Sequence, residues 1–331
     1  MSLLKSAHGG NTREAAELLG VSPEQLLDFS ANINPLGMPA GLKRAIIDNM
    51  DCAERYPDVD YAQLHAALAE HHQIPASWIL AGNGETESIF TLVDGLKPRH
   101  AMIVTPGFAE YRRALQWGDC TIHEFALRED DGWQLTDAIL DALTSELDCL
   151  FLCTPNNPTG TPTPLSVTEA VLQGTDAIVV IDEAYQEFSK HPENTALTLL
   201  PSYGNLIVSR TMSKAFALAG GRVGYLAAAP AIVDACRIVR LPYHLSSQTQ
   251  LVAEVALRHA DHLLGQVDQL RRTRDEMLVR LPQLGVEVID SDANFCLFGP
   301  FADRHDVWQR LLERGVLVRE TGPLGWLRVS V

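Results

Sequence analysis

The sequence predicts an α/β fold, in which helices are layered on a sheet. Short apolar runs typical of buried strands alternate with amphipathic stretches typical of helices through most of the chain. The length of 331 residues is too great for one small core and suggests a large α/β domain with a smaller one. Hydrophobic residues make up 46% and charged residues 21%, which excludes a disordered or a fibrous protein.

The individual elements follow from these patterns. Strands that are buried on both faces form short continuous apolar runs, and we expect them at residues 101–105, 149–153, 177–181, 206–209 and 223–227. Helices carry apolar residues on one face, and we expect them at residues 61–71, 85–96, 135–143 and 232–239. Their alternation predicts a mainly parallel sheet that lies between helices.

The chain is expected to divide into three parts. Residues 1–44 form an N-terminal arm with a short helix at 13–19, which we expect to pack on the C-terminal domain. Residues 45–275 form the large domain, and a long helical pattern from 246 to about 280 bridges it to the small domain. The small domain, residues 276–331, is an α+β unit with a helix at 307–314 and strands at 286–289, 295–298, 316–319 and 326–330.

The charge balance limits the classes of partner. Lys and Arg number 26 against 42 Asp and Glu, and the net charge of −16 argues against binding to nucleic acid or to an anionic membrane. No apolar run approaches the roughly 18 residues of a membrane span, and the N-terminus lacks the apolar region of a signal peptide. The six cysteines are scattered, mostly in apolar segments, which favours reduced thiols and a cytoplasmic protein. The histidines show no metal-binding spacing, so no metal is expected.

A lysine in a hydroxyl-rich loop is the first candidate for chemistry. Lys214 comes just after an apolar strand and the hydroxyl residues Thr211 and Ser213, and Arg222 follows eight residues later. Taken alone, this pattern favours a surface lysine in a polar loop. The upstream segments change this interpretation.

Three upstream segments place polar groups where α/β proteins bind ligands. Asp182 lies at the C-terminal end of a buried strand, and Asn157 follows another one. Residues 82–87 open a helix, and the free backbone N–H groups of a helix N-terminus can hold an anion. Together with Lys214, these segments favour a ligand site over a surface loop.

In type and in order, these four motifs resemble those of the fold-type-I pyridoxal-phosphate enzymes, the class I/II aminotransferase superfamily. The resemblance implies that Lys214 forms the Schiff base with pyridoxal 5'-phosphate and transfers protons in the reaction. It places Asp182 beside the protonated ring nitrogen, and Asn157 and Tyr185 beside the ring hydroxyl. The residues expected to hold the cofactor phosphate are Gly84, Glu85, Thr86, Thr211, Ser213 and Arg222.

Two aromatic residues complete the cofactor site that the resemblance implies. Phe108 matches an aromatic residue whose ring stacks on the cofactor. Tyr56 matches a tyrosine that reaches the phosphate from the partner subunit of a homodimer. For both residues, ordinary packing in the core is the alternative interpretation.

Two families of this superfamily match different parts of the chain. Residues 1–160 resemble threonine-phosphate decarboxylase of cobalamin biosynthesis, in segments 7–11, 28–37, 84–87 and 105–111. Residues 163–331 resemble histidinol-phosphate aminotransferase of histidine biosynthesis, in segments 182–188, 209–216, 220–222 and 240–246. A recombined or designed sequence would show this division, and so would a natural intermediate between the two families.

Both families bind a phosphorylated substrate, so the resemblance implies a second anion site beside the cofactor. Arg319 and Arg328 match arginines that hold the acidic groups of the substrate, and a guanidinium suits this role because it can bind phosphate or carboxylate through two hydrogen bonds. The decarboxylase resemblance adds His8 and Asn32 as contacts of the substrate phosphate. For His8, a flexible terminal residue is the alternative interpretation.

We therefore expect a pyridoxal-phosphate enzyme that acts on a small phosphorylated amino compound. The first hypothesis is decarboxylation of L-threonine O-3-phosphate to (R)-1-aminopropan-2-yl phosphate, because His8, Asn32 and Phe108 lie in the first part of the chain. The alternative is transamination of histidinol phosphate with 2-oxoglutarate. It is favoured by Tyr185, since the decarboxylase has phenylalanine in this motif. A third hypothesis, a non-catalytic binding protein with the same fold, is disfavoured by the complete set of cofactor motifs.

The C-terminus departs from both families. They continue with a terminal helix beyond the strand that holds Arg328, whereas this sequence ends at Val331. The resemblance thus implies a small domain that is short at its end, and a lower stability for that reason.

Overall fold

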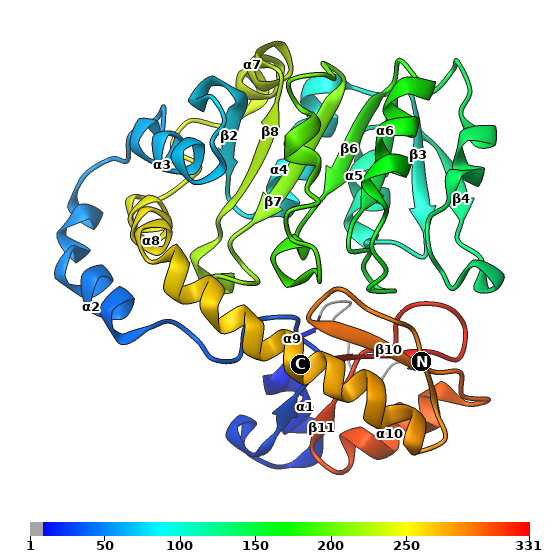
Figure 1. The fold of residues 1–331 in the computed structure, drawn as a ribbon. Coiled ribbons are helices and arrows are strands. Elements are labelled where there is room, and N and C mark those ends of the chain that lie inside the picture. Colours follow the sequence, from blue (N-terminus) through cyan, green and yellow to red (C-terminus); the bar gives the residue numbers. More distant parts are fainter. Residues whose placement is uncertain (1–8) are drawn as a thin grey trace.

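The computed structural model describes residues 9–331, and Figure 1 shows a large layered part above a smaller one. A seven-stranded sheet of the large part consists of β2 (Ile79–Gly82), β3 (His100–Thr105), β4 (Thr121–Ala126), β5 (Cys149–Cys153), β6 (Ile178–Asp182), β7 (Leu206–Thr211) and β8 (Gly224–Ala228). Their order is β2-β8-β7-β6-β5-β3-β4. All neighbouring pairs from β7 to β4 are parallel, and β8 runs antiparallel to both of its neighbours. The prediction of an α/β fold with a mainly parallel sheet is confirmed.

The central strands are buried on both faces. All residues of β5, β7 and β8 are buried, which explains their continuous apolar runs in the sequence. Parallel strands bring their carboxyl ends to one edge of the sheet. At this edge Cys153 pairs with Asp182, and Asp182 pairs with Ser209. The segments that follow these strands therefore start side by side, although they are far apart in the sequence.

Helices bury separate apolar clusters on the two faces of the sheet. The helices of the large part include α3 (Ala62–His72), α4 (Glu85–Leu96), α5 (Ala109–Trp117), α6 (Leu165–Gly174) and α7 (Pro230–Val239). Ile89 of α4 and Leu115 of α5 belong to one buried cluster with Phe151 of the sheet. Val171 of α6 belongs to another, with Ile181. This layering is visible in Figure 1.

The smaller part joins segments from both ends of the chain. Its elements are α1 (Thr12–Leu19), β1 (Leu27–Asp28), β9 (Glu287–Val288), β10 (Phe295–Gly299), α10 (Arg304–Leu312), β11 (Val316–Leu317) and β12 (Leu327–Ser330). Strand β10 pairs antiparallel with β9 and β12, and β1 pairs parallel with β11. Ala15 and Ala16 of α1 lie in one buried cluster with Trp308 and Leu312 of α10. The N-terminal segment thus packs directly on the C-terminal one.

The long helical pattern expected from residue 246 to about 280 corresponds to two helices. Helix α8 (Ser247–Arg258) ends at His259, and α9 (Ala260–Gln283) begins directly after it and runs along the smaller part (Figure 1). His259 leaves the helical conformation with φ −109° and ψ 15°, and its Nδ1 lies 2.9 Å from the carbonyl oxygen of Val255. The helical pattern of the sequence continues through this break and does not reveal it.

Other differences concern elements with weak sequence patterns. Residues 135–143, expected as an α-helix, contain a 3₁₀-helix at Asp137–Ala142. Strand β4 lies at the edge of the sheet and most of its residues are exposed, so it has no continuous apolar run. Strand β2 and the helices α5, α6 and α2 (Ala40–Asp48) are also additional to the predicted elements.

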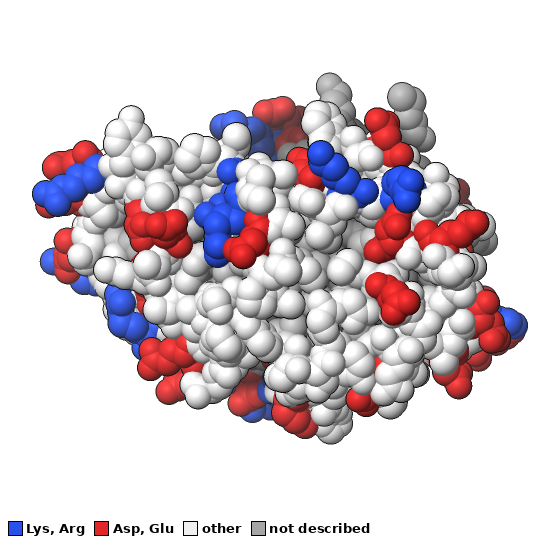
Figure 2. Space-filling view, turned by 90° about the horizontal axis from the view of Figure 1, so that it is seen from above, with Lys and Arg blue, Asp and Glu red and all other residues white. Residues whose placement is uncertain are grey.

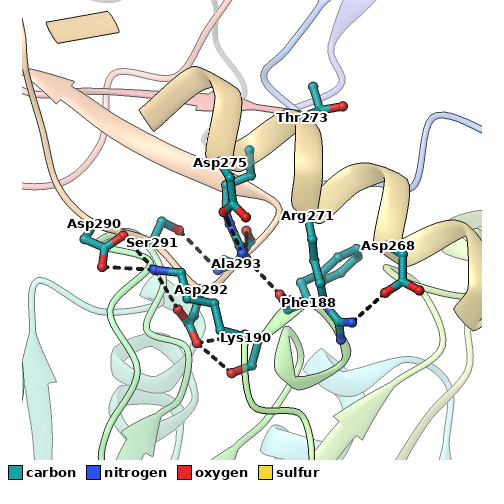
Figure 3. A network of polar contacts seen from close by, with 12 residues as sticks. Phe188, Lys190, Asp268, Arg271, Thr273, Asp275, Asp290, Ser291, Asp292 and Ala293 are labelled. Atoms are coloured by element: carbon teal, nitrogen blue, oxygen red, sulfur yellow. Dashed lines mark hydrogen bonds and ion pairs between the residues drawn. The ribbon is translucent and has the colours of Figure 1, made fainter. Parts of the chain in front are cut away.

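Polar contacts fix α9 and residues 290–293 to the turn that follows β6, and Figure 3 shows this network. Arg274 of α9 is 1% exposed and donates to the carbonyl oxygen of Phe188 over 2.8 Å. Ser189 Oγ donates to Asp292 over 2.6 Å, and Lys190 Nζ donates to both carboxylate oxygens of Asp290. The network therefore holds the smaller part against the carboxyl edge of the sheet.

Charged side chains of both signs are mixed on the surface. Figure 2 shows one face on which lysine and arginine side chains lie in small groups close to acidic ones, while most of the area is uncharged. Among the helices of residues 9–331, none is both long enough and apolar enough to cross a membrane.

Candidate active site

A cavity of about 390 Å³ lies at the carboxyl edge of the sheet, where both parts of the molecule contribute side chains. The predicted site residues that line it are Asn32, Glu85, Thr86, Phe108, Asn157, Asp182, Tyr185, Thr211, Ser213, Lys214, Arg222, Arg319 and Arg328. Gly84 lies against Arg222 at one corner, whereas Tyr56 lies outside the cavity. His8 lies outside the described residues.

Lys214 lies in the loop between β7 and β8 and is half-buried. Burial, and then the positive charge of Arg328, lower the pKa of Lys214 to about 8, although Glu85 and Asp182 act in the opposite direction. With this pKa, about one tenth of the lysine is neutral at pH 7, far more than for an ordinary lysine. Its amine is therefore available as a nucleophile or as a base.

Asp182 ends β6 and belongs to a pair of carboxyl groups. It is 3% exposed, its Oδ1 accepts from the backbone N–H of Ala184 over 2.9 Å, and its Oδ2 accepts from the hydroxyl of Tyr111. Glu85 forms a hydrogen bond with Asp182, and Ser209 Oγ donates to Glu85 Oε1 over 3.0 Å. Burial raises the pKa of both carboxyl groups, and the charge of Asp182 raises that of Glu85 further. Glu85 is thus favoured as the protonated partner, and Asp182 as the charged one.

Gly84 and Arg222 form the corner of the cavity at the start of α4. Gly84 has a φ of 81°, and a β-carbon added to it would lie 2.0 Å from Arg222 Nη2. Arg222 Nη1 donates to the carbonyl oxygen of Ala219 over 3.2 Å. The first N–H groups of α4 have no partner within the helix, and Thr211 and Ser213 add hydroxyl groups that also line the cavity. This corner combines the donors that bind phosphate.

Two arginines enter the cavity from the smaller part. Arg328 of β12 donates to Asn157 Oδ1 over 2.7 Å and to the carbonyl oxygen of Ser30 over 3.1 Å. Its guanidinium lies 5.0 Å from the centre of the Phe295 ring, and burial lowers the pKa of Arg328 to about 10. Arg319 pairs with Arg328 through backbone hydrogen bonds of 2.8 and 2.9 Å. Both side chains therefore reach the cavity from neighbouring backbone positions.

Asn32 and Tyr185 are in direct contact. Asn32 Nδ2 donates to Tyr185 Oη over 3.1 Å, and Asn32 Oδ1 accepts from Ser330 Oγ over 2.7 Å. Burial raises the pKa of Tyr185, so its hydroxyl stays protonated near neutral pH. The amide of Asn32 thus joins the end of β12 to the aromatic residue that follows β6.

The two other predicted aromatic residues have different positions. Phe108 lines the cavity, and its ring lies 5.6 Å from that of Tyr111 at an angle of 84°. Tyr56 is 85% exposed, and its ring lies 5.0 Å from that of Tyr243. Tyr56 therefore does not pack in the core of its own subunit.

Sequence reasoning gave no role to several residues of the site. Tyr111 lies three positions after Phe108, which is one helical turn, so it was the residue most accessible to prediction. Ser209 precedes the hydroxyl loop by two positions, within an apolar strand. Ser330 and Thr321 approach the site only through the fold of the smaller part, and their local sequence carries no signal.

Comparisons with known proteins place the chain in a defined group. A family model described as aminotransferase class I and II matches residues 24–331. The chain is 50% identical over 324 residues to the threonine-phosphate decarboxylase of Salmonella typhimurium, covering 96% of this chain and 89% of that protein. It is 44% identical over 315 residues to histidinol-phosphate aminotransferase 3 of Burkholderia lata, covering 92% of this chain and 85% of that protein. Among solved structures, the histidinol-phosphate aminotransferase of Sinorhizobium meliloti in complex with pyridoxal-5'-phosphate has a TM-score of 0.89 at 21% identity, covering 100% of this chain and 93% of that one.

Proposed function

The chain belongs to the class I and II aminotransferase family, and from this premise we propose that it decarboxylates L-threonine O-3-phosphate with pyridoxal 5'-phosphate as cofactor. The product is (R)-1-aminopropan-2-yl phosphate. The relative from Salmonella typhimurium, which is a threonine-phosphate decarboxylase, supports this reaction. In the structure, the observation that supports a substrate with two acidic groups is that Arg222, Arg319 and Arg328 line one cavity with Lys214.

The residues of the cavity fit the chemical groups of pyridoxal 5'-phosphate. Gly84, Arg222 and the N–H groups of α4 suit the phosphate, and a side chain at position 84 would fill this space. Asp182 suits the protonated ring nitrogen because its negative charge stabilises the positive one. Lys214 supplies the amine that the aldehyde of this cofactor requires.

When bound, the cofactor supplies an electron sink for the bond that breaks at the α-carbon of the substrate. Asp182 keeps the ring nitrogen protonated, and the hydrogen bonds from Tyr111 and Ala184 hold its carboxylate in place. Lys214 holds a proton at Nζ, which can replace the departing carbon dioxide at the α-carbon. The arginines orient the substrate so that the bond to its carboxylate is the one that breaks.

Threonine phosphate has a carboxylate and a phosphate, so it needs two cationic contacts besides those of the cofactor. Arg328 hydrogen-bonds to two neutral oxygen atoms, and its charge can therefore serve an anion. Arg319 lines the same cavity and is the second contact that we propose. His8 and Asn32 are proposed as further contacts of the substrate phosphate, on the basis of the family resemblance.

Transamination of histidinol phosphate with 2-oxoglutarate is the second candidate. Tyr185 favours it, because histidinol-phosphate aminotransferases carry tyrosine in this motif. The relative from Burkholderia lata, which is a histidinol-phosphate aminotransferase, supports the same reading. In this reaction the bond that breaks at the α-carbon is the one to hydrogen, and Lys214 takes the proton.

A paired assay separates the two reactions. The protein loaded with pyridoxal 5'-phosphate is incubated with threonine phosphate in one vessel, and with histidinol phosphate and 2-oxoglutarate in another. Carbon dioxide from the first and no glutamate from the second is the expected result. Glutamate without carbon dioxide would establish the second candidate instead. Lys214→Ala should abolish either activity, which controls for a contaminating enzyme.

We further propose a homodimer in which Tyr56 reaches the cavity of the partner. Large apolar side chains exposed in one subunit can be covered in a dimer, and Tyr56, Ile238 and Leu241 are 85%, 84% and 74% exposed. Two variants test this arrangement. The Lys214→Ala homodimer and the Tyr56→Ala homodimer, each prepared alone, should have low activity. When equal amounts of the two variants are unfolded together and refolded, half of the dimers contain one subunit of each kind. Each of these mixed dimers has one complete site out of two, so the activity should recover to about one quarter of wild type. The absence of any recovery would contradict a shared site.

We propose that the protein works in the cytoplasm. Cys149, Cys153, Cys236 and Cys296 are buried, and they are free thiols. Buried free thiols are typical of proteins in a reducing compartment.

A further inference from the structure

Asn32 uses both polar ends of its side chain within the protein. Its amide is 3% exposed, accepts from Ser330 Oγ over 2.7 Å and donates to Tyr185 Oη over 3.1 Å. We propose that Asn32 and Ser330 are positioning residues, which direct the hydrogen of the Tyr185 hydroxyl into the cavity toward the ring oxygen of the cofactor. This inference rests on the proposed binding of pyridoxal 5'-phosphate.

The direction of the hydrogen bonds determines the role of Tyr185. A phenol hydroxyl has one hydrogen, and it can accept a hydrogen bond while it donates another. Because Asn32 Nδ2 is the donor in their contact, Tyr185 accepts there and keeps its own hydrogen for a different acceptor. Tyr185 lines the cavity, and its ring meets that of Phe295 edge to face, with centres 5.0 Å apart at 87°. With the ring fixed in this way, the cavity is the side to which the hydroxyl can donate.

Ser330 acts through the orientation of the Asn32 amide. Its hydroxyl donates to Asn32 Oδ1, so the opposite end of the amide, which carries the hydrogens, faces Tyr185. The reversed amide would present its oxygen to Tyr185 and draw the phenol hydrogen away from the cavity. Ser330 lies at the end of β12 and Asn32 lies 298 residues before it, so the fold of the smaller part brings the two side chains together.

The arrangement has an electronic consequence at the cofactor. A hydroxyl that receives a hydrogen bond becomes a stronger donor itself. A donor at the ring oxygen stabilises negative charge there, which lowers the pH at which the neighbouring nitrogen, contributed by Lys214, loses its proton. Removing Asn32 or Ser330 should therefore raise this pH even though neither residue needs to touch the nitrogen.

The experiment is a pH titration of the visible absorption spectrum of the protein loaded with pyridoxal 5'-phosphate, without substrate. We expect Tyr185→Phe to raise the midpoint by about one pH unit, and Asn32→Ala and Ser330→Ala to raise it by about half a unit. In the Tyr185→Phe background, Asn32→Ala should add less than about 0.2 unit, because its effect passes through the missing hydroxyl.

Asn205→Ala is the control. Asn205 lies just before β7, and its amide donates to the carbonyl oxygens of Thr175 and Ala177 rather than to Tyr185 or to the loop of Lys214. The midpoint of the pH titration should remain at the wild-type value in this control. An equal shift in this control, or an Asn32→Ala shift of the same size in both backgrounds, would overturn the inference.

Failure of the inference can be distinguished from failure of the proposed function. A wild-type protein that takes up no cofactor contradicts the proposed function, and the inference with it. A wild-type protein that binds the cofactor but keeps its midpoint in Asn32→Ala and Ser330→Ala contradicts the inference alone. If Asn32 serves only the substrate phosphate, its substitution raises KM for threonine phosphate and leaves the midpoint unchanged.

Discussion

Gly84 and Arg222 approach each other so closely that a β-carbon on Gly84 would lie 2.0 Å from Arg222 Nη2. The φ of 81° and ψ of 162° at Gly84 belong to a region that is essentially restricted to glycine. The backbone and the guanidinium thus share one corner of the cavity only because position 84 has no side chain. This relationship makes Gly84 a requirement of the proposed phosphate site.

Gly84→Ala should therefore displace Arg222 and weaken cofactor binding. The loss of a charge-assisted contact to phosphate should raise the Kd for pyridoxal 5'-phosphate at least about tenfold, as measured by fluorescence titration. Gly220→Ala is the matched control, because Gly220 lies two residues before Arg222 and an added β-carbon there meets no heavy atom within 4 Å. A Gly84→Ala protein with the affinity of the control would contradict this description of the corner.

Glu85→Gln should change how the stability of the cofactor-free protein depends on pH. Burial raises the pKa of Glu85 well above its usual range, so the folded protein keeps a proton that the unfolded chain releases above about pH 4.3. This contribution to stability is present at low pH and is lost as the pH rises. Glutamine stays neutral, can donate to Asp182 and can still accept from Ser209. The Tm difference, variant minus wild type, should therefore increase from pH 5 to pH 8.

Asp94→Asn controls for the loss of one negative charge from α4. Asp94 lies at an exposed position of the same helix, away from the Asp182 pair. Its Tm difference should vary less with pH than that of Glu85→Gln. Parallel behaviour of the two variants would show that Glu85 holds no special proton.

The rate of cofactor uptake should follow the titration of Lys214. Only the neutral amine reacts with the aldehyde, and burial lowers the pKa of Lys214 to about 8. The rate, followed by stopped-flow absorbance, should reach half of its maximum near pH 8 and level off above it. A free lysine derivative in the same buffers provides the comparison. A protein rate that continues to rise about tenfold per pH unit up to pH 10, like that of the free amine, would contradict the lowered pKa.

Arg274→Ala should destabilise the protein more than other arginine substitutions on α9. Arg274 is 1% exposed and donates to the carbonyl oxygen of Phe188, so its removal leaves a cavity and leaves this acceptor only the longer hydrogen bond of 3.4 Å from Arg271. We expect a loss of about 3 kcal/mol in the free energy of unfolding. Arg272→Ala, at an exposed position of the same helix, should stay within about 0.5 kcal/mol of wild type. Equal effects in urea unfolding would refute the structural role of Arg274.

The sequence was most informative where the chemistry is local. Lys214 lies near Thr211 and Ser213 in one loop, and the helix start at Glu85 and the strand end at Asp182 are each defined by a few neighbouring residues. Motifs of this kind reach the same cavity because parallel strands end at one edge of the sheet. The α/β fold was predictable for the same reason, since fully buried strands leave continuous apolar runs.

Contacts between distant segments were not predictable from the sequence. Tyr111 and Asp182 are 71 residues apart, and Asn32 and Ser330 are 298 residues apart. Their side chains meet only after the sheet and the smaller part have formed, so no local pattern identifies them. The break at His259 escaped prediction for the opposite reason, because it interrupts a helical pattern that is continuous in the sequence.

The central claim is that Lys214 holds pyridoxal 5'-phosphate in this cavity, and chemical trapping tests it most directly. The protein is incubated with the cofactor, reduced with borohydride, digested and analysed by mass spectrometry. We expect the added mass of the reduced cofactor on the peptide that contains Lys214, and no such adduct after Lys214→Ala. Modification of exposed lysines such as Lys43 and Lys97 with an unmodified Lys214 would contradict the account.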